Sequence, residues 1–78
     1  MDFVWVIHFD VMNGHFGATR VFANSESAFD YGIKYLEETY SGDFLKEMCS
    51  KFEEDYERNE DLFGITNVIT IEKVEIED

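Results

Sequence analysis

Proline is absent from this chain, cysteine occurs once, and glycine occurs five times in 78 residues. With so few chain-breaking residues, a long disordered linker is not expected. The single cysteine, Cys49, cannot form an internal disulfide, whereas small secreted domains usually need several, so a reducing environment is favoured. No apolar run approaches the roughly 20 residues of a membrane-spanning helix. Residues 1–8 also lack the basic start and cleavage site of a signal peptide, so we expect a cytoplasmic protein.

Basic side chains are scarce as well. The chain contains six Lys and Arg but 18 Asp and Glu, which gives a formal net charge of −12. Such a field repels nucleic acids and anionic lipid headgroups, and it attracts basic surfaces within a Debye length of about 8–10 Å. Direct binding to DNA, RNA or a membrane is therefore not expected. A basic protein partner is favoured.

Apolar and aromatic residues are plentiful by contrast. Hydrophobic residues make up 45% of the chain and aromatic residues 17%. Each aromatic side chain can bury about 150–250 Å², which is enough for a compact core without disulfides or metal. We expect residues 1–78 to form a single domain.

Apolar alternation over residues 3–12 predicts a first strand. Val4 and Val6 make its second face apolar as well as its first, which is typical of a central strand. Residues 13–17 begin with Asn-Gly, the pair that favours a tight hairpin turn, and residues 18–23 predict the strand that follows.

Two helices are expected next. Asn24 is the predicted N-cap of a helix over residues 25–40, and Ser41-Gly42 is expected to end it with Gly42 in the left-handed conformation. Asp43 is the predicted cap of a second helix over residues 44–58. Their buried stripes follow helical spacing: Ala28, Phe29, Gly32, Ile33, Leu36 and Tyr40 in the first helix, and Leu45, Met48, Cys49, Phe52 and Tyr56 in the second.

Residues 65–76 predict a final strand. Its apolar parity changes between Ile71 and Val74, which favours a bulge near Glu72-Lys73 or a tail that leaves the sheet. The predicted fold is α+β: a small two-layer β-β-α-α-β domain with a three-stranded sheet and two helices on one face. The first strand should lie in the middle, while the direction of the third stays open.

Residues suited to catalysis or metal binding are few. His8, Asp10 and His15 offer three donors, but their spacing lacks the regularity of a metal site, so we assign no metal. Cys49 lies on an apolar stripe near carboxylates that would raise its pKa, which suits a core thiol rather than a nucleophile. No phosphate-binding glycine loop or other catalytic motif occurs. We therefore expect no enzyme activity and no cofactor.

Carboxylates form the one distinctive group. Ten of them lie between Glu37 and Asp61, and several recur at three, four and seven residues, where helical neighbours are about 5–6 Å apart. This approaches the spacing of phosphates along a nucleic-acid strand, so the group could occupy a groove built for a nucleic-acid backbone. A merely solvated helix face is the simpler explanation. The predicted partner-binding residues are Glu47, Glu53, Glu54, Glu57, Glu60 and Asp61.

An alternative is an adaptor protein that binds through an exposed sheet edge or an aromatic patch, with a homodimer as one form. Five aromatic residues are candidates for exposure: Phe16, Tyr31, Tyr35, Phe44 and Phe63. Salt separates the two hypotheses, because acidic mimicry weakens steeply as ionic strength rises and an apolar contact does not.

Residues 21–31 read Val-Phe-Ala-Asn-Ser-Glu-Ser-Ala-Phe-Asp-Tyr, in which a strand ends in Phe, a cap follows and Glu-x-Ala-x-x-Tyr opens a helix. This resembles a pattern of small phage and mobile-element proteins, and residues 69–76 look like their terminal strand. Size, acidity and layout are similar to anti-CRISPR and anti-restriction inhibitors, several of which imitate DNA or block its binding site. The resemblance implies an inhibitor, in the host cell cytoplasm, that blocks the basic nucleic-acid-binding groove of a host defence nuclease complex. It assigns a role to no particular residue.

Overall fold

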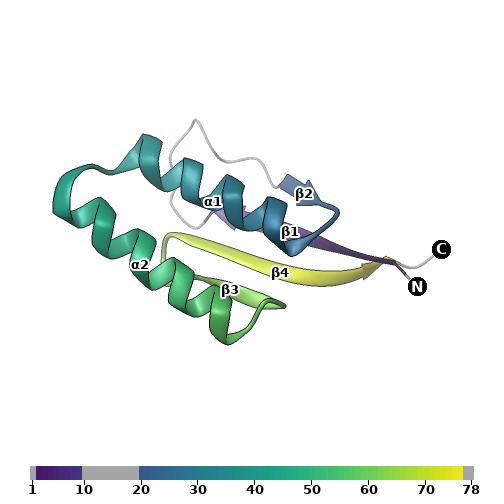
Figure 1. The fold of residues 1–78 in the computed structure, drawn as a ribbon. Helices are drawn as coiled ribbons and strands as arrows, with labels where there is room; N and C mark the ends of the chain where they lie inside the picture. Colours follow the sequence, from purple (N-terminus) through teal and green to yellow (C-terminus); the bar gives the residue numbers. More distant parts are fainter. Residues whose placement is uncertain (1, 10–19, 77–78) are drawn as a thin grey trace.

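The computed structural model describes residues 2–9 and 20–76. Four antiparallel strands form one sheet in the order β2-β1-β4-β3, and both helices cover the same face of it (Figure 1). The α+β class and the central place of the first strand, between the second and the last, are confirmed. The prediction of three strands is wrong by one strand. The elements are β1 (Asp2–Phe9), β2 (Arg20–Phe22), α1 (Ser25–Thr39), α2 (Gly42–Arg58), β3 (Leu62–Ile65) and β4 (Ile69–Ile76).

The predicted last strand is in fact a hairpin. Its turn lies at residues 66–68, where Val68 N–H donates to the Ile65 carbonyl at 3.0 Å and Asn67 has a φ of 64°. Asparagine adopts this left-handed conformation more readily than most residues, which lets the chain reverse without glycine. β4 then pairs with β1 without a break from Ile69 to Ile76. The predicted bulge is therefore wrong, and the parity change means that the apolar residues near the end of β4 point to the other face of the sheet.

β1 and β2 pair antiparallel, with Val6 opposite Val21. This confirms the pairing expected of the first two strands. The predicted turn at residues 13–17, and the ends of the predicted strands at residues 10–12 and 18–19, lie outside the described residues.

The first helix cap is confirmed and the second is not. Asn24 Oδ1 accepts a hydrogen bond from Ser27 N–H at 2.8 Å, which satisfies one of the free amides at the start of α1. α2 begins at Gly42, earlier than predicted, and Ser41 rather than Asp43 holds the N-cap position, without a side-chain hydrogen bond. Gly42 adopts a φ of 64°, the predicted left-handed conformation, which reverses the chain between the helices.

The core lies between the helices and the sheet. Phe29 of α1 stacks on Phe52 and Tyr56 of α2, with ring centroids 5.1 and 4.6 Å apart. Gly32 allows this packing, because an added Cβ would come within 2.5 Å of the Phe52 ring. Gly32 therefore marks a close approach of α1 to α2, whereas Ile69 of the sheet would lie at an ordinary contact distance of 3.6 Å. The buried core residues are Ile7, Ala28, Tyr35, Leu36, Met48, Phe52, Phe63, Ile69 and Ile71.

Candidate functional site

The six predicted partner-binding residues are all exposed, and we call them the acidic surface: Glu47, Glu53, Glu54 and Glu57 of α2, and Glu60 and Asp61 of the following turn. At about 100° per residue, Glu47, Glu54 and Glu57 fall within about 80° of arc on α2. That arc is opposite the buried Met48 and Phe52. The amphipathic pattern of the helix thus turns these three carboxylates directly outward.

The turn after α2 is tied firmly to the sheet. The Trp5 indole N–H donates to the Glu60 carbonyl at 3.0 Å, and Lys73 N–H donates to the Asp61 carbonyl at 2.7 Å. Asn59 Oδ1 accepts from Asp61 N–H at 3.0 Å. These bonds use backbone groups of Glu60 and Asp61, so their side chains are held at the end of α2 and left to solvent.

Ion pairs neutralise the acidic surface only in part. Lys51 Nζ lies 3.4 Å from Glu47 Oε1, and Lys73 Nζ lies 3.8 Å from Asp61 Oδ1. Exposed pairs of this kind contribute about 0–1 kcal/mol and exchange readily. Among the residues that the structure describes, Glu53, Glu54 and Glu57 have no ion-pair partner.

The carboxylates at the end of α2 also oppose the helix dipole. The C-terminus of a helix carries a partial negative charge, so anions there are unfavourable. Arg58 is the basic residue of the last turn, and it lies 3.8 Å from Asp55 rather than beside Glu57. Glu57, Glu60 and Asp61 therefore add negative charge at the end of the helix that already carries a partial negative charge.

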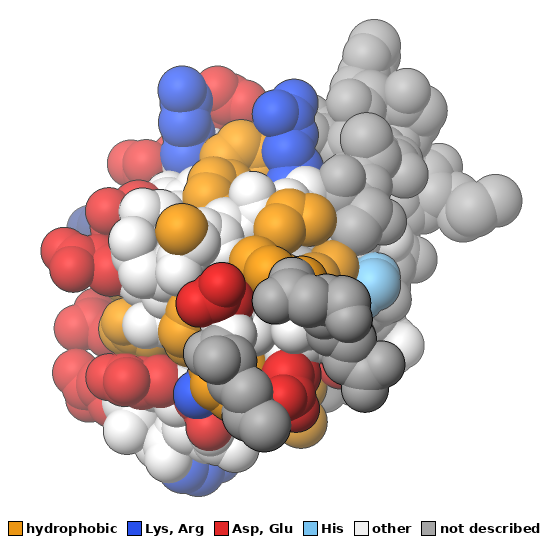
Figure 2. Space-filling view, turned by 90° about the vertical axis from the view of Figure 1, so that its right-hand side faces the viewer, with side chains coloured by type: hydrophobic (Ala, Val, Ile, Leu, Met, Phe, Trp, Pro, Cys, Tyr) orange, Lys and Arg blue, Asp and Glu red, His pale blue; other side chains and the backbone are white. Residues whose placement is uncertain are grey.

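α1 adds carboxylates that the sequence-based site did not include. Together α1 and α2 carry ten carboxylates and four basic side chains, so they account for half of the formal charge of −12. Figure 2 shows acidic side chains along its left-hand margin, which corresponds to the front of Figure 1, where the helices lie. Glu26, Asp30 and Glu37 recur at four and seven residues, and this spacing was the signal that could have found them.

The described residues give little support to a metal site or to a reactive cysteine. Within residues 2–9 and 20–76, no group of three or more His, Cys, Asp or Glu is placed to hold a metal ion. Asp10 and His15 of the rejected metal set lie outside the described residues, while His8 Nε2 lies 3.2 Å from Glu72 Oε1. Burial raises the pKa of the Cys49 thiol, and the Glu37 carboxylate raises it further, as predicted.

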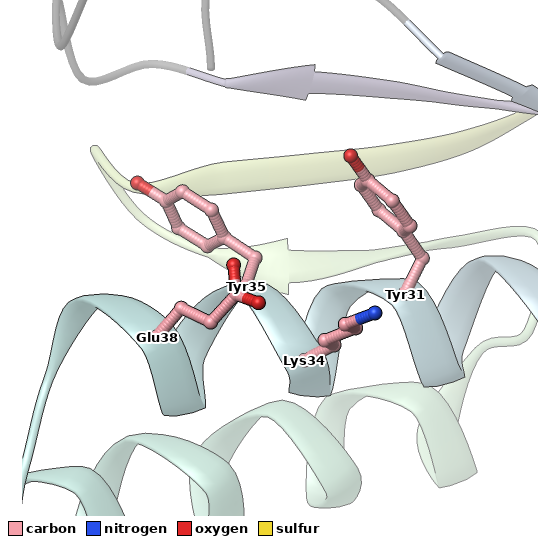
Figure 3. Close-up of a pocket in the computed structure, with 4 residues that line it drawn as sticks. All are labelled: Tyr31, Lys34, Tyr35 and Glu38. Carbon is pink, nitrogen blue, oxygen red and sulfur yellow. The ribbon is translucent and has the colours of Figure 1, made fainter. Parts of the chain in front are cut away.

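One small cavity lies beside α1. It measures about 140 Å³, below the roughly 300–1,000 Å³ of ligand pockets, and is lined by Tyr31, Lys34, Tyr35 and Glu38. Figure 3 shows the two tyrosines pointing toward the sheet, while Lys34 and Glu38 lie along the helix. Burial raises the pKa of the Tyr35 phenol, so it does not provide a phenolate near neutral pH.

A second hollow, of about 300 Å³, runs along the β3–β4 hairpin. Its one carboxylate, Asp55, already accepts a hydrogen bond from Gly64 N–H at 2.8 Å. A single committed carboxylate does not provide the pair of groups that acid–base chemistry requires.

The predicted aromatic patch is formed in small part. Tyr35 and Phe63 are buried and Tyr31 is half-buried, whereas Phe44 is 55% exposed. Phe16 lies outside the described residues. Tyr35 and Phe63 are therefore core residues rather than surface anchors, because the sheet and the helices enclose them.

Comparison with protein-family models, with curated proteins and with solved structures finds no match to this chain. In the described part of the chain, no helix has the length and hydropathy needed to cross a membrane.

Proposed function

We propose that this protein is an inhibitor that docks its acidic surface on the basic nucleic-acid-binding groove of another protein, in the manner of anti-CRISPR or anti-restriction proteins that mimic DNA. The observation that carries the proposal is the exposure of all six predicted carboxylates along the outer side of α2 and the turn that follows it. The proposed partner is a nucleic-acid-binding protein of a host defence nuclease complex. Catalysis has no part in the proposed role.

The geometry of α2 supports mimicry of a phosphate backbone. Glu54 and Glu57 are one turn apart, and Glu47 lies two turns before Glu54 on the same side of the helix. Residues three or four apart on a helix are separated by about 5–6 Å, which is the spacing of Glu54 and Glu57, and Glu47 lies about 10 Å from Glu54 along the helix axis. A groove lined by Arg and Lys can pair with these carboxylates through charge-assisted hydrogen bonds.

The cost of the arrangement also supports a role in binding. Carboxylates at neighbouring helical positions repel each other, and those near the C-terminus of α2 interact unfavourably with the helix dipole. Among the described residues, Glu54 and Glu57 have no basic side chain within ion-pair distance to relieve this. A cationic partner would provide that relief on binding.

Charge reversal tests the proposal. The triple change Glu54→Lys, Glu57→Lys and Asp61→Lys should abolish capture of basic nucleic-acid-binding proteins from a bacterial lysate on the immobilised chain. Double-stranded DNA should compete with the wild-type chain for the captured protein. The far-UV circular dichroism spectrum should be unchanged, because all three side chains are exposed.

A matched control separates position from total charge. The triple change Asp2→Lys, Glu38→Lys and Glu75→Lys alters three exposed carboxylates outside the acidic surface and brings the formal charge from −12 to the same −6. The proposal predicts that this control retains binding. Equal loss in both triples, or equal retention, would mean that the acidic surface is not the binding site.

A further inference from the structure

The sheet has a second face, which neither helix covers, and its residues follow from the strand register. Val21, Val6, Glu72 and Leu62 are direct neighbours across the four strands, and Val4 lies opposite Val74 in the next row. Alternation along each strand puts all of them on the side opposite the buried Ile7 and Ile71. We call the apolar members the open sheet face: Val4, Val6, Val21, Leu62, Val74 and Ile76.

The open sheet face concentrates the exposed apolar residues of the described chain. Six large hydrophobic side chains are exposed in the described part of the chain. Four of them belong to the open sheet face: Val21 at 59%, Leu62 at 53%, Ile76 at 44% and Val74 at 38%. An antiparallel sheet with helices on one side normally carries polar residues on the other. Here the strands have the apolar composition of a sheet that is covered on both sides.

We propose that a second copy of this chain covers the open sheet face, so that two sheets stack face to face in a two-fold symmetric dimer. This proposal concerns a different surface from the proposed function and does not depend on it.

The distribution of charge favours a second copy. Asp2, His8 and Glu72 are the charged or titratable side chains that the register places on this side of the sheet, whereas ten carboxylates lie on the helices of the other layer. Sheets stack about 10 Å apart, so the helices of a face-to-face dimer lie on its two outer sides. Contact between copies through their helices would instead bring like charges together.

Glu72 can enter such an interface with a partner in place. Its Oε1 lies 3.2 Å from His8 Nε2 on the neighbouring strand. A carboxylate that keeps a hydrogen-bond donor costs far less to bury than an isolated one.

The available area suits a modest dimer. Four strands about 4.8 Å apart and up to about 27 Å long give at most about 500 Å² per copy, or about 1,000 Å² in total. Specific interfaces begin near 1,000 Å², and those at this end of the range are weak or transient. Residues on a two-fold axis meet their own equivalents, so the valines and leucine of one copy pack against the same residues of the other.

Sedimentation equilibrium of the full chain, from about 1 μM to about 1 mM, tests the proposal. The wild-type chain should form a dimer within this range. Leu62→Lys and Val74→Lys, on two different strands, should each raise the dimer dissociation constant at least tenfold. Val21→Lys gives a third position, on an edge strand, where a change is least able to disturb folding; circular dichroism checks each variant.

Phe44→Lys is the matched control. Phe44 is as exposed as Leu62, at 55%, but lies on α2 and away from the sheet. The control has the same net charge as the variants and should dimerise like the wild-type chain. A wild-type chain that is monomeric up to about 1 mM overturns the proposal, whether the face then stays bare or binds another macromolecule. A dimer that tolerates Lys at all three sheet positions overturns it as well.

Discussion

At the scale of single residues, Cys49 shows how neighbours set the chemistry of a side chain. The thiol lies half-buried on α2 and packs against the core. Burial disfavours the thiolate, and the negative charge of Glu37 disfavours it further, so both raise the pKa from its ordinary value of 9.0. Because the nucleophilic form of cysteine is the thiolate, this position suits packing rather than covalent chemistry.

The alkylation rate of Cys49 should therefore have a pH midpoint above 9.0, the ordinary thiol value. A raised folded-state pKa stabilises the fold below the unfolded-state pKa, and this contribution is lost as the pH rises through the folded-state value. The midpoint should fall to the ordinary value when the chain is unfolded in urea. Glu37→Gln should lower the midpoint part of the way. A folded-state midpoint at or below 9.0 would contradict the described environment.

Individual exposed residues were the easiest part of the site to predict. Helical periodicity determined that Glu47, Glu54 and Glu57 face outward once Met48 and Phe52 were assigned to the core. The positions of Glu60 and Asp61 were harder to predict, because they depend on hydrogen bonds from Trp5 and Lys73, which are distant in sequence.

At the scale of elements, the β3–β4 hairpin was missed for a local reason. Residues 65–71 form an almost continuous run of β-branched side chains, which reads as one strand. The reversal depends on Asn67, whose positive φ gives a much weaker signal than the Asn-Gly pair at residues 13–14. β3 is also only four residues long, too short to show a clear period.

Gly64 makes this hairpin possible. An added Cβ would overlap the Ile69 carbonyl and come within 3.0 Å of Thr70 Cα, both of which are backbone atoms of β4. Gly64→Ala should therefore lower the free energy of unfolding by about 2 kcal/mol or more, since the strands must separate. Urea denaturation measures this change.

Thr66→Ala is the control for Gly64→Ala. Thr66 is exposed in the turn of the same hairpin, so its replacement should change stability by no more than about 0.5 kcal/mol. Similar unfolding midpoints for the two variants would show that the strands do not approach so closely at Gly64.

At the scale of the whole molecule, the fold separates two kinds of surface. The helical layer carries ten carboxylates, and the open sheet face carries four exposed apolar residues. The sequence predicted the order of the first four elements and most of the helical core stripes, because these follow from local periodicity. It predicted that both helices cover one face of the sheet, but not that exposed apolar residues would gather on the other face, since the strand register depends on contacts between distant segments.

The central claim, that the acidic surface occupies a groove built for nucleic acid, is tested most directly by the salt dependence of binding to the protein captured from the lysate. Mimicry predicts that the affinity falls at least tenfold between about 50 and about 200 mM salt, and that double-stranded DNA and the chain exclude each other from the captured protein. An affinity that does not respond to salt, or a partner that binds the chain and DNA together, would contradict it.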